Sequence, residues 1–338
     1  MGWLRRLLGL DAPGRQREAV RRGRLTNERW DAVRPLLRPV LRGVTLPIRH
    51  AQTKPPLRRP AMPHLAELVV VDQPDAMRYV SAERPASWGV SAAAVFAAAR
   101  QNLVRNLRQP VAPPPEGASM IRFVDDGNAY WTSYLLLDGW LAGLAGRVGG
   151  RPVAFAPDRR TLIVVPDQAE LLHTLFQMVE ADYLQEPRAI SPVAYVSDDN
   201  GRTVPYDAPP GHPLHQWVRR SERVLASREY AHQHAAFEGR YGDATLVEPT
   251  LVESPGGSVI TTASWPQTGS VLLPRTDFVA FVSEPGVPQF VVPWPEVIEH
   301  VPLRPADGLD PARYRAERWP SDEVLGRLRA AAVPGLTS

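Results

Sequence analysis

Residues 153–184 read VAFAPDRRTLIVVPDQAELLHTLFQMVEADYL, and this stretch decides the fold class. Two apolar runs, Val153–Ala156 and Thr161–Val165, flank a short polar segment that contains a proline, which is typical of a β-hairpin. From Gln168 to Leu184 apolar residues recur three and four positions apart, which indicates an amphipathic helix. A hairpin followed by a helix that packs on it predicts an α+β fold.

The residues before this stretch continue the same pattern. Leu65–Asp72 is rich in valine and predicts a buried strand, and Ser91 is in position to cap a helix that runs to Leu107. Ile121–Val124 predicts a short strand. Tyr130–Leu141 is apolar enough to be buried, but its spacing leaves the type of element open.

The residues after it predict one long helix and a run of strands. The helix covers Leu214–Phe237, and five short apolar segments follow between residues 244 and 292, separated by Pro/Gly turns. Closely spaced strands of this kind predict an antiparallel meander or half-barrel packed on that helix. A last helix is expected from Ser321, its cap, to about Ala332.

The first part of the chain has a different composition. Thr26–Leu41 has helical spacing that Pro35 and Pro39 interrupt, which predicts two short, kinked helices. His50–Pro63 contains four prolines and predicts an extended basic linker. The predicted domains are a basic Arg/Pro-rich helical arm with its linker (1–62), an α+β lobe (63–207), and a lobe of one helix plus an antiparallel sheet with a C-terminal helix (208–338).

The charge is divided unevenly along the chain. Residues 1–60 hold 15 basic and four acidic side chains, a net of +11, whereas the remainder carries 24 basic and 32 acidic side chains, a net of −8. Such an arm is expected to bind an acidic partner, a nucleic acid or an anionic membrane surface, or to fold back onto its own acidic body. The residues expected to make those contacts are Trp3, Arg5, Arg6, Arg21, Arg22 and Arg24.

Several classes of protein are excluded. The chain has no cysteine, so disulfides, thiolate nucleophiles and zinc fingers are impossible. It lacks a phosphate-binding P-loop, a G-x-G-x-x-G fingerprint and a G-x-S-x-G elbow, and we expect no cofactor. Gly127–Gly146 has the length of a membrane span, but Asp138 at its middle predicts a buried core element instead. No secretory signal is recognised, so the expected location is cytoplasmic, with a peripheral membrane position as the alternative.

Two groups of side chains are candidates for a site. Asp125, Asp126 and Asp158 lie at predicted strand ends, where they would bind Mg²⁺ or act as an acid/base pair, or simply hydrogen-bond to turn amides. The second group consists of Asn102, Tyr130, Ser133 and Tyr134, which suits either a ligand pocket or an ordinary core. His232 falls on an apolar stripe and is expected to be a core histidine and not a metal ligand, so no metal site is assigned.

A family resemblance covers about residues 65–185. The motifs that carry it are Trp88-Gly89, Asn102-Leu103, Asp126-Gly127, Tyr130, Ser133, Pro157 and Leu162. With these the chain resembles the YtpQ-like family of bacterial proteins, a domain of unknown function. It departs from the family at Arg160, where an acidic residue is usual. The resemblance implies an α+β cytoplasmic fold and no particular activity.

Because strong catalytic signatures are missing, binding is the function that the sequence favours. We expect an interaction protein that engages an acidic partner through residues 1–60 and another protein through the α+β lobe. The alternatives are a metal-assisted hydrolase that uses Asp125, Asp126 and Asp158, and a non-specific association of the arm with polyanions or membranes.

Overall fold

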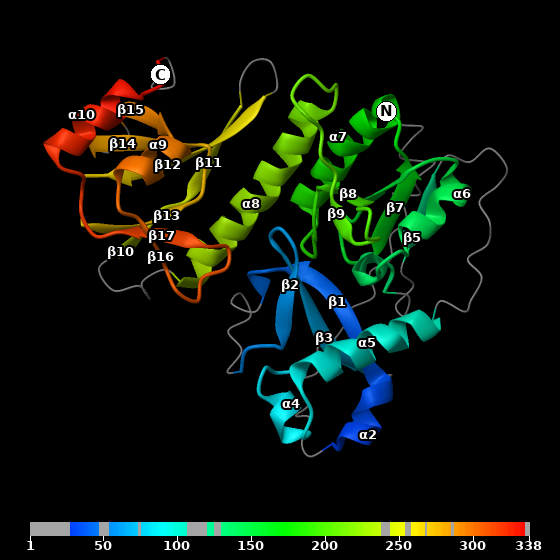
Figure 1. Ribbon diagram of the computed structural model, residues 1–338. Coiled ribbons are helices and arrows are strands. Elements are labelled where there is room, and N and C mark those ends of the chain that lie inside the picture. The colour runs from blue at the N-terminus through cyan, green and yellow to red at the C-terminus, as the bar shows by residue number, and fades with distance from the viewer. Residues whose placement is uncertain are drawn as a thin grey trace.

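The computed structural model describes residues 28–46, 54–73, 76–106, 120–124, 130–237, 244–253, 258–267, 269–284 and 287–334. Helices and four sheets form three lobes, with the long helix α8 (His215–Phe237) running between the central and C-terminal lobes (Figure 1). The predicted α+β class is confirmed. Within the described residues, no helix combines the length and the apolar character that crossing a membrane requires.

The N-terminal lobe is built on a four-stranded sheet. Its strands are β1 (Leu37–Gly43), β2 (Arg58–Met62), β3 (Leu65–Gln73) and β4 (Ala76–Tyr79), and β3 pairs with the other three. The first helical turns are α2 (Trp30–Val33) and η1 (Arg34–Leu36); α4 (Arg84–Ser87) and α5 (Ala92–Asn106) follow the sheet. Ser91 caps α5 as predicted, because its Oγ accepts a hydrogen bond from the amide of Ala94 at 3.2 Å.

This sheet corrects two predictions. The second of the two helices expected over Thr26–Leu41 is instead mostly strand β1, which pairs along its whole length with β3. Pro39 is tolerated because β1 is an edge strand that needs no second hydrogen-bonded neighbour. The end of the expected linker forms β2, so one sheet extends across the boundary predicted near residue 62.

The central lobe contains a fully antiparallel sheet in the order β5-β7-β6-β8-β9. Its elements are β5 (Ile121–Val124), η2 (Trp131–Leu136), η3 (Ala142–Leu144), α6 (Ala145–Val148), β6 (Pro152–Phe155), β7 (Thr161–Pro166), α7 (Ala169–Gln185), β8 (Ala194–Ser197) and β9 (Thr203–Pro205). The predicted hairpin is β6–β7, the helix after it is α7, and the predicted strand Ile121–Val124 is β5. The element left open begins as the 3₁₀ helix η2.

The C-terminal lobe holds two four-stranded sheets. One contains β11 (Pro249–Glu253), β12 (Val259–Pro266), β14 (Phe278–Glu284) and β15 (Val287–Pro293); the other contains β10 (Ala244–Leu246), β13 (Ser270–Pro274), β17 (Arg313–Ala316) and β16 (Arg304–Pro305). Helices α9 (Trp294–His300) and α10 (Asp322–Ala330) complete the lobe. The expected meander is interrupted because β13 leaves the first sheet to pair with β17, which makes β12 and β14 parallel neighbours.

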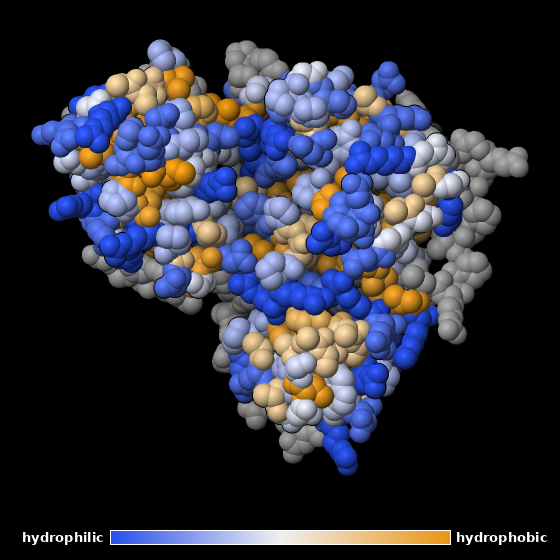
Figure 2. Space-filling model, in the orientation of Figure 1, coloured by the Kyte–Doolittle hydropathy of each residue, from blue (hydrophilic) through white to orange (hydrophobic). Residues whose placement is uncertain are grey.

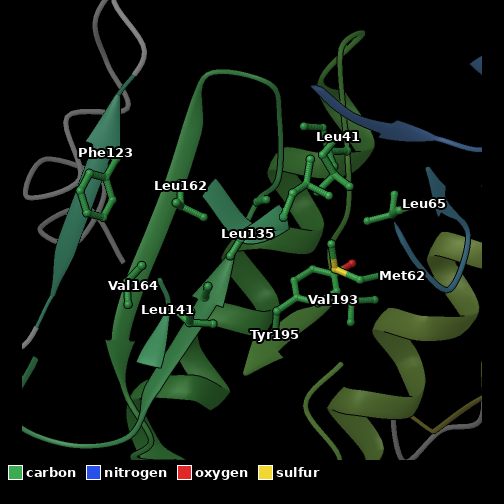
Figure 3. Packing of buried hydrophobic residues seen from close by; sticks show 14 of the residues in the cluster. Leu41, Met62, Leu65, Phe123, Leu135, Leu141, Leu162, Val164, Val193 and Tyr195 are labelled. Atoms are coloured by element: carbon green, nitrogen blue, oxygen red, sulfur yellow. The ribbon is translucent and has the colours of Figure 1, made fainter. Parts of the chain in front are cut away.

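A shared apolar core joins the first two lobes. Figure 3 shows Leu41, Met62 and Leu65 of the N-terminal sheet beside Val193 and Tyr195 of the central lobe. All five side chains are buried. Burial of apolar surface at roughly 25 cal/mol per Å² therefore attaches strands β1 and β2 firmly to the central lobe. Leu135, Leu136 and Leu141 lie in the same core, so the described part of the long apolar stretch 127–146 is a core element, as predicted.

Candidate binding cleft

The four predicted pocket residues lie in buried, well-packed surroundings. Asn102 uses its amide to donate to the carbonyl oxygens of Arg34 (2.7 Å) and Leu37 (3.1 Å), which ties α5 to the start of β1. Ser133 and Tyr134 are buried within η2, and the Tyr134 ring stacks on Trp140 with 5.3 Å between ring centroids. Burial raises the pKa of Tyr134. These contacts give the residues packing roles.

Tyr130 packs against the same apolar cluster as Tyr134 and also against the cluster of the N-terminal sheet. Its backbone has a left-handed conformation (φ 52°), and its hydroxyl lies 3.7 Å from the sulfur of Met77. Burial, followed by the neighbouring Asp72, raises the pKa of Tyr130 far above its ordinary value. The phenol therefore stays protonated throughout the physiological range.

Of the three residues in the predicted acidic cluster, the structure describes only Asp158. Asp158 Oδ1 accepts hydrogen bonds from the amides of Arg160 (2.6 Å) and Thr161 (3.0 Å), which is the turn-stabilising role. Asp125 and Asp126 lie outside the described residues, as do Trp3, Arg5, Arg6, Arg21, Arg22 and Arg24. Within the described residues, no three His, Asp or Glu side chains come together to hold a metal ion.

A cleft that the sequence did not indicate opens where the three lobes meet. It has a volume of about 310 Å³ and lies along one face of α8. The β2–β3 turn, strands β8 and β9, strands β11 and β12 and the residues before β14 form its other walls. Figure 2 shows the surface hollowed between the C-terminal lobe on the left and the rest of the molecule. We call it the central cleft.

An ion pair forms one wall of the central cleft. The Asp277 carboxylate accepts two hydrogen bonds from the Arg223 guanidinium, both 2.8 Å long, and two more from the amide and hydroxyl of Thr261, at 2.7 and 2.8 Å. Burial would raise the pKa of Asp277, but the hydrogen bonds from Arg223 and Thr261 outweigh it and hold that pKa below its usual range. The charges of Arg223 and Asp277 on this wall therefore cancel each other.

A histidine and a tyrosine face each other across another wall. His64 follows Pro63 in the two-residue turn between β2 and β3 and has a positive φ of 61°. Proline followed by a positive φ is typical of a type II turn. The His64 ring meets the Tyr230 ring edge-on with 6.3 Å between centroids. Burial lowers the pKa of His64, against the opposing influence of Glu229 and Asp310, so the neutral imidazole is favoured at pH 7.

Arg275 brings a positive charge to the rim. Its amide donates to the Tyr230 hydroxyl at 3.2 Å, and its side chain is exposed and makes no hydrogen bond or ion pair with any described residue. Glu222 on the opposite wall accepts a hydrogen bond from Arg219 at 2.8 Å. Among the described charged groups of the cleft discussed above, the guanidinium of Arg275 is therefore the one that no described residue engages.

Sequence patterns gave no signal for these residues. His64 comes just after the segment predicted as a linker, at the start of the predicted α+β lobe. Tyr230 lies in a predicted helix and Arg275, 45 positions later, lies between two predicted strands. Only the packing of the lobes around α8 brings them together.

Comparisons with known proteins add no further assignment: no family model, curated protein or solved structure matches the chain. The resemblance to the YtpQ-like family therefore stays a prediction that rests on the short motifs quoted above.

Proposed function

We propose that this chain is a binding protein whose central cleft takes a small organic molecule with an apolar or aromatic body and one anionic group. The observation that carries the proposal is the position of the cleft at the junction of all three lobes, where its walls come from segments far apart in the sequence. Binding sites for small molecules occur at such junctions and combine an apolar lining with a few polar groups.

The lining supports that choice of ligand. Tyr195, Leu225, Tyr230, Pro205 and Pro249 supply aromatic and aliphatic surface for the body of the ligand. Among the charged groups, Asp277 and Glu222 already accept hydrogen bonds from arginines, whereas the Arg275 guanidinium has no partner among the described residues. These charges of the lining favour a ligand with an anionic group over a ligand with a cationic group.

Hydrogen bonding within the cleft favours binding over nucleophilic catalysis. Thr261 is engaged with Asp277, Thr276 donates to the carbonyl of Phe278, and the Ser227 hydroxyl has no hydrogen-bond partner among the described residues. No described hydroxyl of the cleft is thus paired with a histidine, the arrangement that activates a nucleophile.

The test is a titration of the full chain with 8-anilinonaphthalene-1-sulfonate, a fluorescent probe with an aromatic body and a sulfonate. We expect saturable binding at one site, weakened roughly tenfold by Arg275→Glu, because a hydrogen bond to a charged group contributes about 1.5 kcal/mol.

Arg304→Glu is the matched control, since Arg304 is also an exposed arginine, lies on β16 and does not line the cleft. It should leave the affinity unchanged. Equal affinity of the wild type and Arg275→Glu would contradict the proposal, as would unsaturable binding.

A second proposal concerns the basic N-terminal segment, for which we keep the expected acidic partner or polyanion. Within the described residues three of its positive charges are already balanced: Lys54 pairs with Glu83, Arg58 with Asp310 and Arg59 with Glu67. Residues 1–27 carry seven arginines against Asp11 and Glu18, so binding to a polyanion is assigned to that portion.

A further inference from the structure

The His64 imidazole lines the central cleft and makes no hydrogen bond with any described residue. Neither of its ring nitrogens is enclosed by protein, so both remain accessible. We propose that His64 selects the ligand: the molecule that the cleft binds carries, besides its anionic group, a neutral hydroxyl that hydrogen-bonds to this imidazole. The inference rests on the proposed function, because it concerns the same ligand in the same cleft.

The other polar side chains of the described lining are occupied or enclosed. Hydrogen bonds within the protein already engage the hydroxyls of its two tyrosines and two threonines. They also engage Glu222, Arg223 and Asp277. Ser227 Oγ has no partner among the described residues, but almost none of its surface is exposed. Besides the exposed guanidinium of Arg275, the imidazole of His64 is therefore the polar group that a ligand can engage.

The backbone at His64 supports a role for its ring. The residue has a φ of 61°, which glycine and asparagine adopt at less cost than histidine does. Its carbonyl oxygen accepts a hydrogen bond from the amide of Val44 at 3.1 Å, which ties the turn to the residues after β1. Residues kept in such sparsely populated conformations cluster at ligand-binding positions. The chain thus holds an imidazole where the turn itself favours glycine.

The charges around His64 favour a neutral partner. Burial lowers the pKa of His64, while the carboxylates of Glu229 and Asp310 act in the opposite direction. These carboxylates would repel a second anion, and they do not require a cation, because Glu229 already accepts from Thr45 and Asp310 from Arg58. A neutral imidazole has one donor and one acceptor nitrogen, and a hydroxyl can pair with either.

The cleft has room for a ligand that reaches both groups. Its volume of about 310 Å³ suits a small organic molecule. Tyr230 lies between the two contacts, since its hydroxyl accepts from the amide of Arg275 and its ring meets the His64 ring edge-on. An aromatic ring packed beside Tyr230 therefore lies near both residues. The ligand class that fits is a hydroxylated aromatic acid.

The test is calorimetric titration of the full chain at pH 7 with benzoate, 3-hydroxybenzoate and 4-hydroxybenzoate. All three carry the same carboxylate, and the last two add a phenolic hydroxyl that stays protonated at this pH. We expect one of the hydroxybenzoates to bind roughly fivefold more tightly than benzoate, which corresponds to one hydrogen bond. His64→Gly should abolish this preference, and glycine adopts the positive φ of the turn without strain.

The preference is a ratio of two affinities for one protein, so a general loss of affinity in His64→Gly cancels. His64→Asn is a second variant, because asparagine also tolerates a positive φ and its shorter amide should reduce the preference as well. His173→Gln is the control, since His173 is an exposed histidine on α7 that does not line the cleft, and it should keep the preference. A preference that survives in His64→Gly, or none in the wild type, would overturn the inference.

Titration with 8-anilinonaphthalene-1-sulfonate separates this inference from the proposed function. Saturable binding of that probe, weakened by Arg275→Glu, together with equal or undetectable binding of the three benzoates, would support the cleft and refute the role of His64. If neither the probe nor any benzoate binds, both proposals are wrong.

Discussion

Gly43 shows how strictly one residue can be specified at the contact between β1 and α8. A Cβ atom added at this position would overlap the Glu229 carboxylate, which the hydrogen bonds from Thr45 hold in place. The backbone of β1 approaches α8 this closely only because residue 43 has no side chain.

We therefore expect Gly43→Ala to lower the free energy of unfolding by about 1–3 kcal/mol, the usual cost of overpacking. Urea denaturation followed by circular dichroism measures it. Gly146→Ala is the control, because a Cβ added to that helical glycine meets no neighbouring atom within 4 Å. If both variants unfold at the same urea concentration as the wild type, then β1 does not lie as close to Glu229 on α8 as described here.

At the scale of elements, the basic N-terminal segment was predicted as a helical arm with a linker, yet residues 37–43 and 58–62 are strands of the first sheet. A truncation that starts at Pro63 would remove two strands, so it cannot test the arm. Substitutions in the full chain avoid this problem.

We expect the triple variant Arg21→Gln, Arg22→Gln and Arg24→Gln to weaken binding to a random DNA duplex. The plot of log affinity against log salt should flatten by up to about 2.7, since each neutralised phosphate contributes about 0.9 to the slope. Fluorescence anisotropy between low and physiological salt measures this slope.

Arg304→Gln, Arg318→Gln and Arg327→Gln together form the matched control, because all three are exposed arginines of the C-terminal lobe. Equal slopes for the two triple variants would refute binding by the arm. Binding of the wild type to anionic vesicles without binding to DNA would move the proposal to a membrane surface that contacts Trp3, Arg5 and Arg6.

For the whole molecule, α8 is the element that joins the lobes. Arg220 bonds to Glu180 on α7 and to Glu253 on β11, while Arg223 bonds to Asp277 of the C-terminal lobe. Neighbouring residues of one helix thus connect two lobes through charged hydrogen bonds, and the walls of the central cleft depend on them.

Asp277→Asn should lower the stability of the protein by about 2 kcal/mol at pH 7, since it weakens charge-assisted hydrogen bonds. The folded protein holds the pKa of Asp277 below its unfolded value of about 3.9, so this contribution is fully present above that pH. It disappears as the pH falls through the lower, folded pKa. Thermal melts between pH 3 and pH 7 should show the two proteins converging at the acid end, and a constant difference would contradict the ion pair.

Much of the local structure followed from the sequence alone. The hairpin β6–β7, helices α5, α7 and α8, and strands β3 and β5 were predicted because the period of their apolar residues reflects which face is buried. Strand β1 was mistaken for part of a helix, since Trp30, Val33, Leu36 and Leu37 have helical spacing. Only pairing with β3 makes the residues from Leu37 onward a strand. Local pattern cannot report such pairing.

The candidate site was decided by tertiary structure. His64, Tyr230 and Arg275 come from three separate segments. A sequence determines the period of burial within each segment, because neighbouring residues fix it. Which segments then meet around α8 depends on long-range packing, and that packing alone gives the central cleft its charge and shape.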